Sequence, residues 1–314
     1  MTFNIKKFVK ILELVYDFWY NIVGGYDDMK IDKDVKVIRA LLNISQQELA
    51  KEIDTSYEVI NRWENASVDP EDSNINLLYS FAYKKKIFLN IIHEQMLKDI
   101  YNQQNEVVLF HGSKRGINEQ LDLEHSKEVN DFGKGFYLGE SFEQAATYIA
   151  YSKSHYIYSF LLNLSGLKIV EFNVEQEWMF AIAYYRGWLD KYKDHVRIKR
   201  IREKVENADI IIAPIADNKM FDLIDEFVTG MTTDLQCEKA LSVTNLGFQY
   251  VAKTQNAINQ LRKLSDMFLC DEEKDAYVNK RLETNKVGLD KVQIARIEYR
   301  NKGKYIKEIL KWKN

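Results

Sequence analysis

Two short stretches of the chain carry residues whose types and spacing could do chemistry together. The first, "VVLFHGSKRGI" (107–117), is a β-rich run that ends in His111, Gly112 and Ser113. The second, "NDFGKGFYLGESFEQAATYIAY" (130–151), holds three of the chain's 13 glycines and two tyrosines eleven residues apart, Tyr137 and Tyr148. An imidazole can hydrogen-bond a hydroxyl group, and two aromatic rings can stack on the two faces of a flat ligand. The pattern predicts a pocket for a flat, polar molecule.

Two kinds of phosphate-binding loop are excluded for the glycine-rich stretch. A P-loop requires a glycine five residues before Gly-Lys and a serine or threonine after it, but Glu128 and Gly135 occupy those positions. The dinucleotide fingerprint G-x-G-x-x-G requires a third glycine where this chain has Leu138. We predict instead that Gly133, Gly135 and Gly139 let the backbone fold tightly against the ring of the ligand.

The two stretches together resemble the catalytic domain of ADP-ribosyltransferases of the poly(ADP-ribose) polymerase type. The resemblance rests on "FHGS" (110–113), "FGKGFYLG" (132–139) and the second tyrosine at an eleven-residue offset. It is closer to uncharacterised bacterial toxin-like members of that superfamily, which have the motif "DFGKGFYL". Further stretches typical of those members are "IIIAPIAD" (210–217) and "NLGFQYVAKT" (245–254), so the resemblance spans residues 106–262.

The resemblance implies that NAD is the substrate and that the domain is a split β-sandwich. It places His111 on a ribose hydroxyl, the backbone of Gly112 at the nicotinamide carboxamide, and Tyr137 and Tyr148 on the two faces of the nicotinamide ring. Ser113 and Phe136 complete the implied NAD-binding set. His111 and Tyr137 also belong to the implied catalytic set.

The chain departs from this family at residues that matter for catalysis. The family's glutamate on a later strand corresponds to Gln249, and a second glutamate of the toxin-like relatives corresponds to Gln255. Strand alternation predicts that Gln249, Val251, Lys253 and Gln255 share one face. Glutamine cannot act as a general base at neutral pH. Ala145 stands where polymerase-type enzymes carry a serine.

These departures leave two alternatives open, transfer of single ADP-ribose units or an inactivated copy. Chain elongation is not expected, because it relies on the glutamate. Glu238 is a substitute carboxylate only if its helix abuts the cleft.

A second motif lies nearer the N-terminus. Ser45 followed by Gln46, Gln47 and Glu48 is a capping box that predicts a helix through Ala50, and a second helix is expected from about Thr55 to Trp63. With "ISQQELAKEI", "INRWENA" and Pro70, the stretch resembles the helix-turn-helix domains of phage repressors. The residues that this resemblance places at DNA are Gln46, Ser56, Tyr57, Asn61 and Arg62.

The charge of this segment is unfavourable for DNA binding. Between Lys33 and Asp69 there are five Lys or Arg residues and seven Asp or Glu residues. Because neutralisation of phosphates dominates DNA affinity, a monomer should bind weakly, and we expect a homodimer on operator DNA. The alternative is a helical module for dimer or partner contacts.

Composition sets the broader limits. The 314 residues are 46% hydrophobic and 13% aromatic with a net charge of −3, which indicates a globular protein with no global attraction to nucleic acid or membrane. Two cysteines, Cys237 and Cys270, make a disulfide framework implausible and fit a cytoplasmic protein. The histidines show no metal-ligand spacing, so no metal is expected. A basic tail carries Lys304, Lys307, Lys311 and Lys313.

These observations predict an α+β protein. Its expected parts are an N-terminal amphipathic helix (1–30), an all-α helix-turn-helix domain (31–90), a helical linker (91–105), an ADP-ribosyltransferase-like domain (106–267) and a helical C-terminal extension (268–314). The main functional hypothesis is an NAD-dependent mono-ADP-ribosyltransferase of a toxin–antitoxin or phage-defence system, with an antitoxin and a protein or nucleic-acid target as partners. The rival hypothesis is a DNA-binding transcription regulator with a degenerate domain that senses NAD or a partner.

Overall fold

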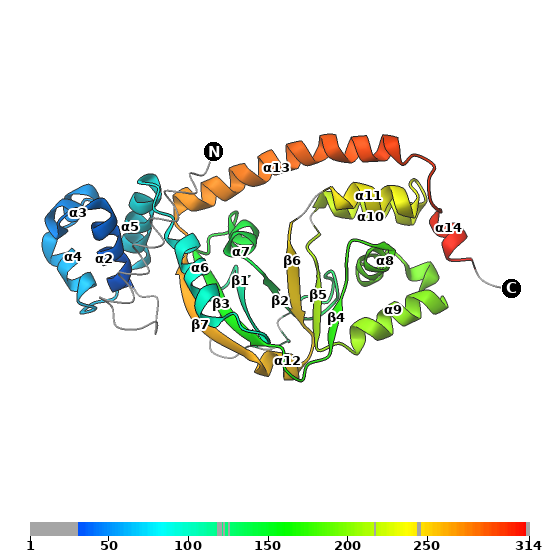
Figure 1. Cartoon of the computed structure of the whole chain (residues 1–314), viewed down its shortest axis with the longest axis horizontal. Coiled ribbons are helices and arrows are strands. Elements are labelled where there is room, and N and C mark those ends of the chain that lie inside the picture. Colours follow the sequence, from blue (N-terminus) through cyan, green and yellow to red (C-terminus); the bar gives the residue numbers. More distant parts are fainter. Residues whose placement is uncertain are drawn as a thin grey trace.

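The computed structural model describes residues 31–311, apart from 118–120, 122, 125, 217 and 244–245. The amphipathic helix expected at 1–30, Asp217 and Lys313 lie outside these residues. A helical domain is followed by a mixed β-sheet flanked by helices, and a long helix, α13 (Asp271–Glu298), runs from the helical domain to the far end of the molecule (Figure 1). The predicted α+β class is confirmed. Among the described helices, none is long and apolar enough to cross a bilayer.

Within the described residues, the helical domain has five helices around one core. They are α2 (Ile31–Leu42), α3 (Gln46–Glu52), α4 (Tyr57–Glu64), α5 (Asp72–Lys84) and α6 (Leu89–Tyr101). The predicted capping box is present, because the Ser45 side chain accepts from the backbone N–H of Glu48 and the Glu48 carboxylate accepts from that of Ser45. Asp54 adopts a positive φ of 53°, a left-handed conformation that Asp tolerates, and this makes the turn between α3 and α4 tight. Ile92 and Met96 of the expected linker belong to the core of this domain.

In the part of the chain that the structure describes, seven strands form one sheet in the order β4-β5-β6-β2-β1-β3-β7. The strands are β1 (Glu106–Gly112), β2 (Phe136–Gly139), β3 (Tyr156–Asn163), β4 (Ile169–Glu171), β5 (Ile210–Pro214), β6 (Phe248–Ala252) and β7 (Leu261–Phe268). All neighbours are antiparallel except β4 and β5. The two halves of the sheet meet where β1 pairs with β2 through Phe110 and Gly139. The sequence resemblance implied a split β-sandwich, whereas the described strands form one sheet that is narrow at this joint.

Helices cover one face of the sheet in two groups. α8 (Gln176–Tyr185), α9 (Val196–Glu206), α10 (Asn218–Thr229) and α11 (Asp234–Ser242) pack over β5 and β6 around Trp178, Phe180 and Phe227, which are fully buried. α6 and α7 (Phe142–Ile149) pack over β1 and β3 around Phe110 and Phe142. On the other face, Leu109, Leu138 and Phe160 form a smaller core that includes residues of α12 (Gln255–Asn259). The remaining elements are a 3-10 helix (Asp190–Tyr192) and α14 (Ile306–Ile309).

The helical domain and the sheet share part of their cores. Phe268, at the end of β7, belongs to the core of the helical domain, with its ring 5.9 Å from that of Tyr79 and 5.1 Å from that of His155. Asn90 of α6 donates one hydrogen bond to the carbonyl of Phe268 at 2.8 Å and another to the carboxyl group of Glu273 at 2.7 Å. From this junction α13 continues past α5, α7 and α11, against which it packs in turn (Figure 1).

Glu273 makes the stability of the junction dependent on pH. Complete burial raises its pKa to about 8 from an ordinary value of 4.5, although the hydrogen bond from Asn90 opposes the shift. Between these two values the folded protein keeps a proton that the unfolded chain has lost, so the stability contribution falls as pH rises from about 4.5 to about 8. We expect Glu273→Gln to remove this penalty, which amounts to roughly 1 kcal/mol per pH unit within that window.

Urea unfolding of both proteins at pH 5 and pH 8 measures the effect. The gain in stability from Glu273→Gln should be larger at pH 8. Asp275→Asn, an exposed substitution on the same helix, is the control and should give the same small change at both pH values. An equal effect of Glu273→Gln at both pH values would contradict the prediction.

Candidate functional site

The outer surface of α4 presents polar side chains while its inner face is anchored in the core. Ile60 and Trp63 are buried at 0% and 4% exposure, whereas Tyr57 is 42% exposed and Arg62 is also exposed. Ser56 caps the helix, with its hydroxyl oxygen accepting from the backbone N–H of Val59 at 3.4 Å. The helix therefore begins at Tyr57, two residues later than the sequence predicted.

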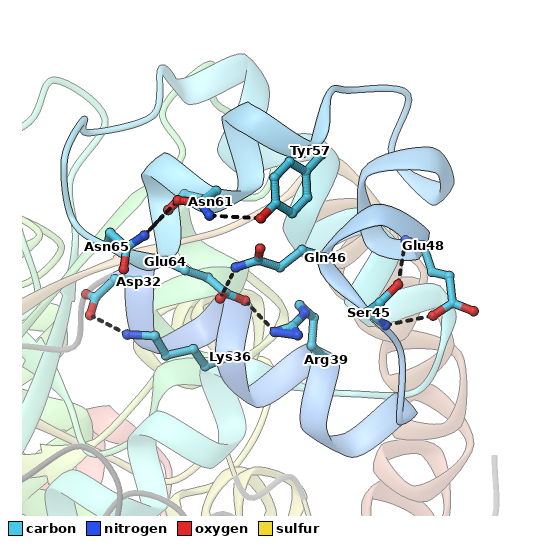
Figure 2. Close-up of polar contacts among 10 residues, drawn as sticks. All are labelled: Asp32, Lys36, Arg39, Ser45, Gln46, Glu48, Tyr57, Asn61, Glu64 and Asn65. Carbon is cyan, nitrogen blue, oxygen red and sulfur yellow. Dashed lines mark hydrogen bonds and ion pairs between the residues drawn. The ribbon is translucent and has the colours of Figure 1, made fainter.

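Hydrogen bonds hold the polar side chains on the outer side of α4 in place. Asn61 donates from its amide to the hydroxyl of Tyr57 at 3.3 Å, and Asn65 donates to the amide oxygen of Asn61 at 2.7 Å (Figure 2). Arg62 donates from Nε to the carbonyl of Glu58 at 3.4 Å. Tyr57, Asn61 and Arg62 thus form one pre-arranged polar surface.

A buried carboxylate fixes this helix to its neighbours. Glu64 accepts from Arg39 of α2 at 2.9 Å and from the side-chain amide of Gln46 of α3 at 2.5 Å (Figure 2). Three helices are therefore joined through one side chain that is only 7% exposed. Gln46, which the sequence resemblance placed at DNA, lies beside α4 with its amide nitrogen engaged within the protein.

Two acidic residues of the helix-turn-helix segment are buried, which reduces the acidic charge at its surface. Asp34 is 1% exposed and accepts from the hydroxyl of Tyr79, with His93 Nε2 2.8 Å from its other oxygen. Glu64 is likewise buried and paired. The remaining acidic residues of the segment lie on the surface, so a monomer still lacks the excess of cations that tight DNA binding requires.

A second candidate site lies at the joint between β1 and β2. His111 stacks on Phe136, with ring centroids 4.4 Å apart and an interplanar angle of 20°, and its Nδ1 lies 2.7 Å from the carbonyl oxygen of Tyr137. Since a carbonyl only accepts, Nδ1 carries the proton, and in the neutral ring Nε2 is an acceptor. Burial lowers the pKa of His111, so the neutral form prevails at pH 7.

The side chain of Tyr137 lies on the other face of the sheet. Its ring packs against the core beneath α8 to α11, and its hydroxyl donates to the carbonyl of Gly133 at 2.8 Å and accepts from the N–H of Phe132 at 3.1 Å. Phe136 packs against the core of the opposite face. The structure therefore connects His111 to the backbone of Tyr137 but keeps the two side chains apart.

Gln249 belongs to a buried polar network on the same face as Tyr137. In the sheet it lies beside Gly139 of β2 and Ala213 of β5. Its amide nitrogen donates to Asp131 at 3.1 Å and to the carbonyl of Pro214 at 3.2 Å. Asp131, 6% exposed, also accepts from Arg186 at 2.7 Å, and the Arg186 guanidinium lies 3.3 Å from the centroid of the Phe221 ring.

Comparison with known proteins finds two family models that match parts of the chain. A family model described as "Protein of unknown function (DUF3990)" matches residues 107–263, half of the chain, and a helix-turn-helix model matches residues 35–78. The chain belongs to the DUF3990 family. The match to the helix-turn-helix model confirms the predicted helix-turn-helix domain. The description of the DUF3990 family assigns no activity, so the transferase chemistry stays a prediction. No curated protein and no solved structure matches the chain.

Within the DUF3990 region, the prediction that Gln255 lies on the same strand face as Gln249 is wrong. The strand ends at Ala252, Thr254 caps the next helix, and Gln255 is the exposed first residue of α12, where it donates to the side chain of Asn259 at 2.9 Å. Glu238 lies on α11, which packs against α10 and α13, and pairs with Lys239. The geometry connects neither residue to His111 or Gln249.

The glycines of the DUF3990 motifs have packing reasons that the sequence did not reveal. A Cβ on Gly112 would stand 2.5 Å from the carbonyl oxygen of Ala145 on α7, and one on Gly135 would stand 2.6 Å from Val251 of β6. Such distances are shorter than any real contact. Gly112 therefore allows the close approach of α7, and Gly135 that of β6. Packing alone explains both glycines, without the predicted close approach to a ligand.

Other predicted residues of this region lie at its surface. Tyr148 is 55% exposed on α7, with Lys114 Nζ 5.0 Å from its ring centroid, and no ring contact joins it to Tyr137. The hydroxyl of Ser113 donates to the carbonyl of Gly116. Among the described residues, no cluster of His, Cys, Asp or Glu could hold a metal ion.

Sequence reasoning missed two residues that the structure places beside Gln249 and the DFGKG stretch. Neither Asp131 nor Lys253 was assigned a role from the sequence, although both lie in the quoted motifs and Lys253 was placed on the face of Gln249. Lys253 donates from Nζ to the carbonyls of Phe132 and Lys134, and burial lowers its pKa to about 8. The signal that could have revealed both residues is the presence of a charged side chain in an otherwise apolar or glycine-rich motif.

The Asp131 network allows a matched test of buried and exposed ion pairs. We expect Asp131→Ala to destabilise the protein by about 3 kcal/mol, because it leaves the Arg186 guanidinium and the Gln249 amide without their acceptor. Glu128→Ala, three residues away, removes an exposed partner of Lys134 and should cost less than about 1 kcal/mol. Chemical denaturation of both variants measures the difference, and equal costs would show that the network does not stabilise the fold.

Proposed function

We propose that this protein is a DNA-binding regulator whose helix α4 enters the major groove. The observation that carries the proposal is the polar outer surface of α4, formed by Tyr57, Asn61 and Arg62, on a helix whose inner face is fixed by Trp63 and Glu64. In helix-turn-helix proteins the second helix of the motif occupies the groove and its exposed side chains contact base edges. Asparagine and arginine are suited to adenine and guanine respectively.

The charge of the domain supports binding as a dimer. Few cations surround α4, so each domain makes few phosphate contacts and contributes little sequence-independent affinity. Two copies on half-sites one helical turn apart double the contacts, which is the arrangement that helix-turn-helix dimers use. We therefore expect the target to be a pseudo-palindrome.

Selection from a random duplex pool, followed by binding assays with the full chain, tests this proposal. We expect Arg62→Ala to weaken binding to the selected duplex about tenfold or more, because a base contact of this kind is worth about 1–3 kcal/mol. Lys239→Ala, on α11 of the sheet domain, removes one cation elsewhere and should leave the affinity unchanged. Failure to enrich any duplex, or equal losses in the two variants, would contradict the proposal.

We propose in addition that the sheet domain binds NAD at His111, which makes the regulator responsive to that nucleotide. The neutral imidazole supports this, since its Nδ1 proton is held by the Tyr137 carbonyl and Nε2 can accept from a ribose hydroxyl. Among the residues that the structure describes, none hydrogen-bonds to Nε2. ADP-ribose transfer is the further activity that the sequence resemblance suggests for the same site.

His111→Asn separates the proposed ligand contact from the role of this residue in the fold. The asparagine amide can still donate to the Tyr137 carbonyl but has no counterpart of Nε2. Isothermal titration with NAD should show affinity about tenfold to a hundredfold weaker in the variant, as expected for one lost hydrogen bond. Glu128→Gln is the control. Undetectable NAD binding by the unmodified protein, or unchanged binding by His111→Asn, would exclude the site.

A further inference from the structure

Exposed aromatic rings and cations gather at the C-terminal end of α7. Tyr148 and Tyr151 are 55% and 63% exposed, which is high for tyrosine. Lys114 Nζ lies 5.0 Å from the ring centroid of Tyr148, and Arg281 Cζ lies 5.9 Å from that of Tyr151. Lys153 is exposed two residues further along the chain. These five residues are called the tyrosine surface below.

The cations of the tyrosine surface are not neutralised. Within the described part of the chain, no carboxylate forms an ion pair with Lys114, Lys153 or Arg281. The nearby carboxylate of Glu143 is already paired with Lys280 at 2.6 Å. The exposed acids of α13 closest to Arg281 in sequence, Asp275 and Glu283, point about 120° and 160° away from it around the helix, at 100° per residue.

The surface is held in place by packing beneath it. Tyr277 of α13 contacts Phe142 of α7 with ring centroids 6.3 Å apart, and Lys274 donates to the carbonyl of Ser152 at 3.4 Å. Gly112 lets the end of β1 approach α7 closely, so the loop that carries Lys114 starts beside the same helix. Three segments distant in sequence are thus fixed around the two rings, and little ordering is needed on binding.

We propose that the tyrosine surface binds single-stranded nucleic acid. Unpaired bases expose aromatic faces that stack on tyrosine rings, and the phosphates between them are suited to unpaired lysine and arginine side chains. A duplex hides the faces of its bases, so the surface favours a single strand over the duplex that α4 contacts. This site is separate from α4 and does not depend on NAD binding.

Fluorescence anisotropy with the full chain tests the proposal, using a labelled 20-nucleotide single-stranded DNA, an RNA of the same sequence and the corresponding duplex. We expect Tyr151→Ala to weaken single-strand binding about tenfold, as for the loss of one stacked base, and to leave duplex binding unchanged. Arg281→Gln should lower the slope of log affinity against log salt by about 0.7 for the single strand. Comparison of the DNA and RNA arms identifies which nucleic acid is preferred.

Two controls make the outcome decisive. Tyr305→Ala removes an exposed tyrosine beside α14 and should have no effect, while Arg62→Ala should affect the duplex and spare the single strand. The proposal is overturned if the unmodified protein does not bind the single strand, or if Tyr151→Ala and Arg281→Gln leave that binding intact. Equal losses on single strand and duplex would also overturn it, because one surface would then serve both.

Discussion

The sheet depends on the pairing of β1 with β2 at Phe110 and Gly139. At this joint a four-strand half and a three-strand half meet, and each half is covered by its own group of helices. α7 starts three residues after Gly139, so the chain turns from β2 into a helix directly beside this joint. Gly112 allows that helix to lie against β1. At this joint His111 stacks on Phe136 on one face of the sheet, and Gln249 lies beside Gly139 on the other face.

The helical domain depends on the hydrogen bonds that the buried carboxylate of Glu64 makes to two other helices. Glu64 is buried with two partners from other helices, so α4 cannot rotate without leaving a carboxylate unpaired in the core. The exposed side of α4 is thereby held at a fixed angle to α2 and α3. A surface of this kind can make the same contacts in each copy of a dimer.

The parts of the structure that sequence reasoning found are those specified by local signals. Ser45 and Glu48 specify a helix start within four residues, and the β-rich run that ends in His111 and Gly112 forms β1. β3 and β7 were not predicted. β3 is buried along most of its length, a pattern that does not distinguish a strand from a buried helix, and β7 is a polar edge strand with little alternation. The Asp131 network joins residues 118 and 55 positions apart, and no pattern within one segment could reveal it.

The position of Phe268 has a consequence for how this protein could be divided. The helical domain is continuous in sequence up to Tyr101, yet part of its core is the aromatic ring of Phe268, 167 residues later in the chain. A gene fragment that encodes the helix-turn-helix motif alone would therefore produce an incomplete module with an apolar hole. The same dependence restricts recombination, because exchange of either half between relatives must preserve the fit at this ring. The core of the helical domain is therefore complete only when the end of β7 is present in the same molecule.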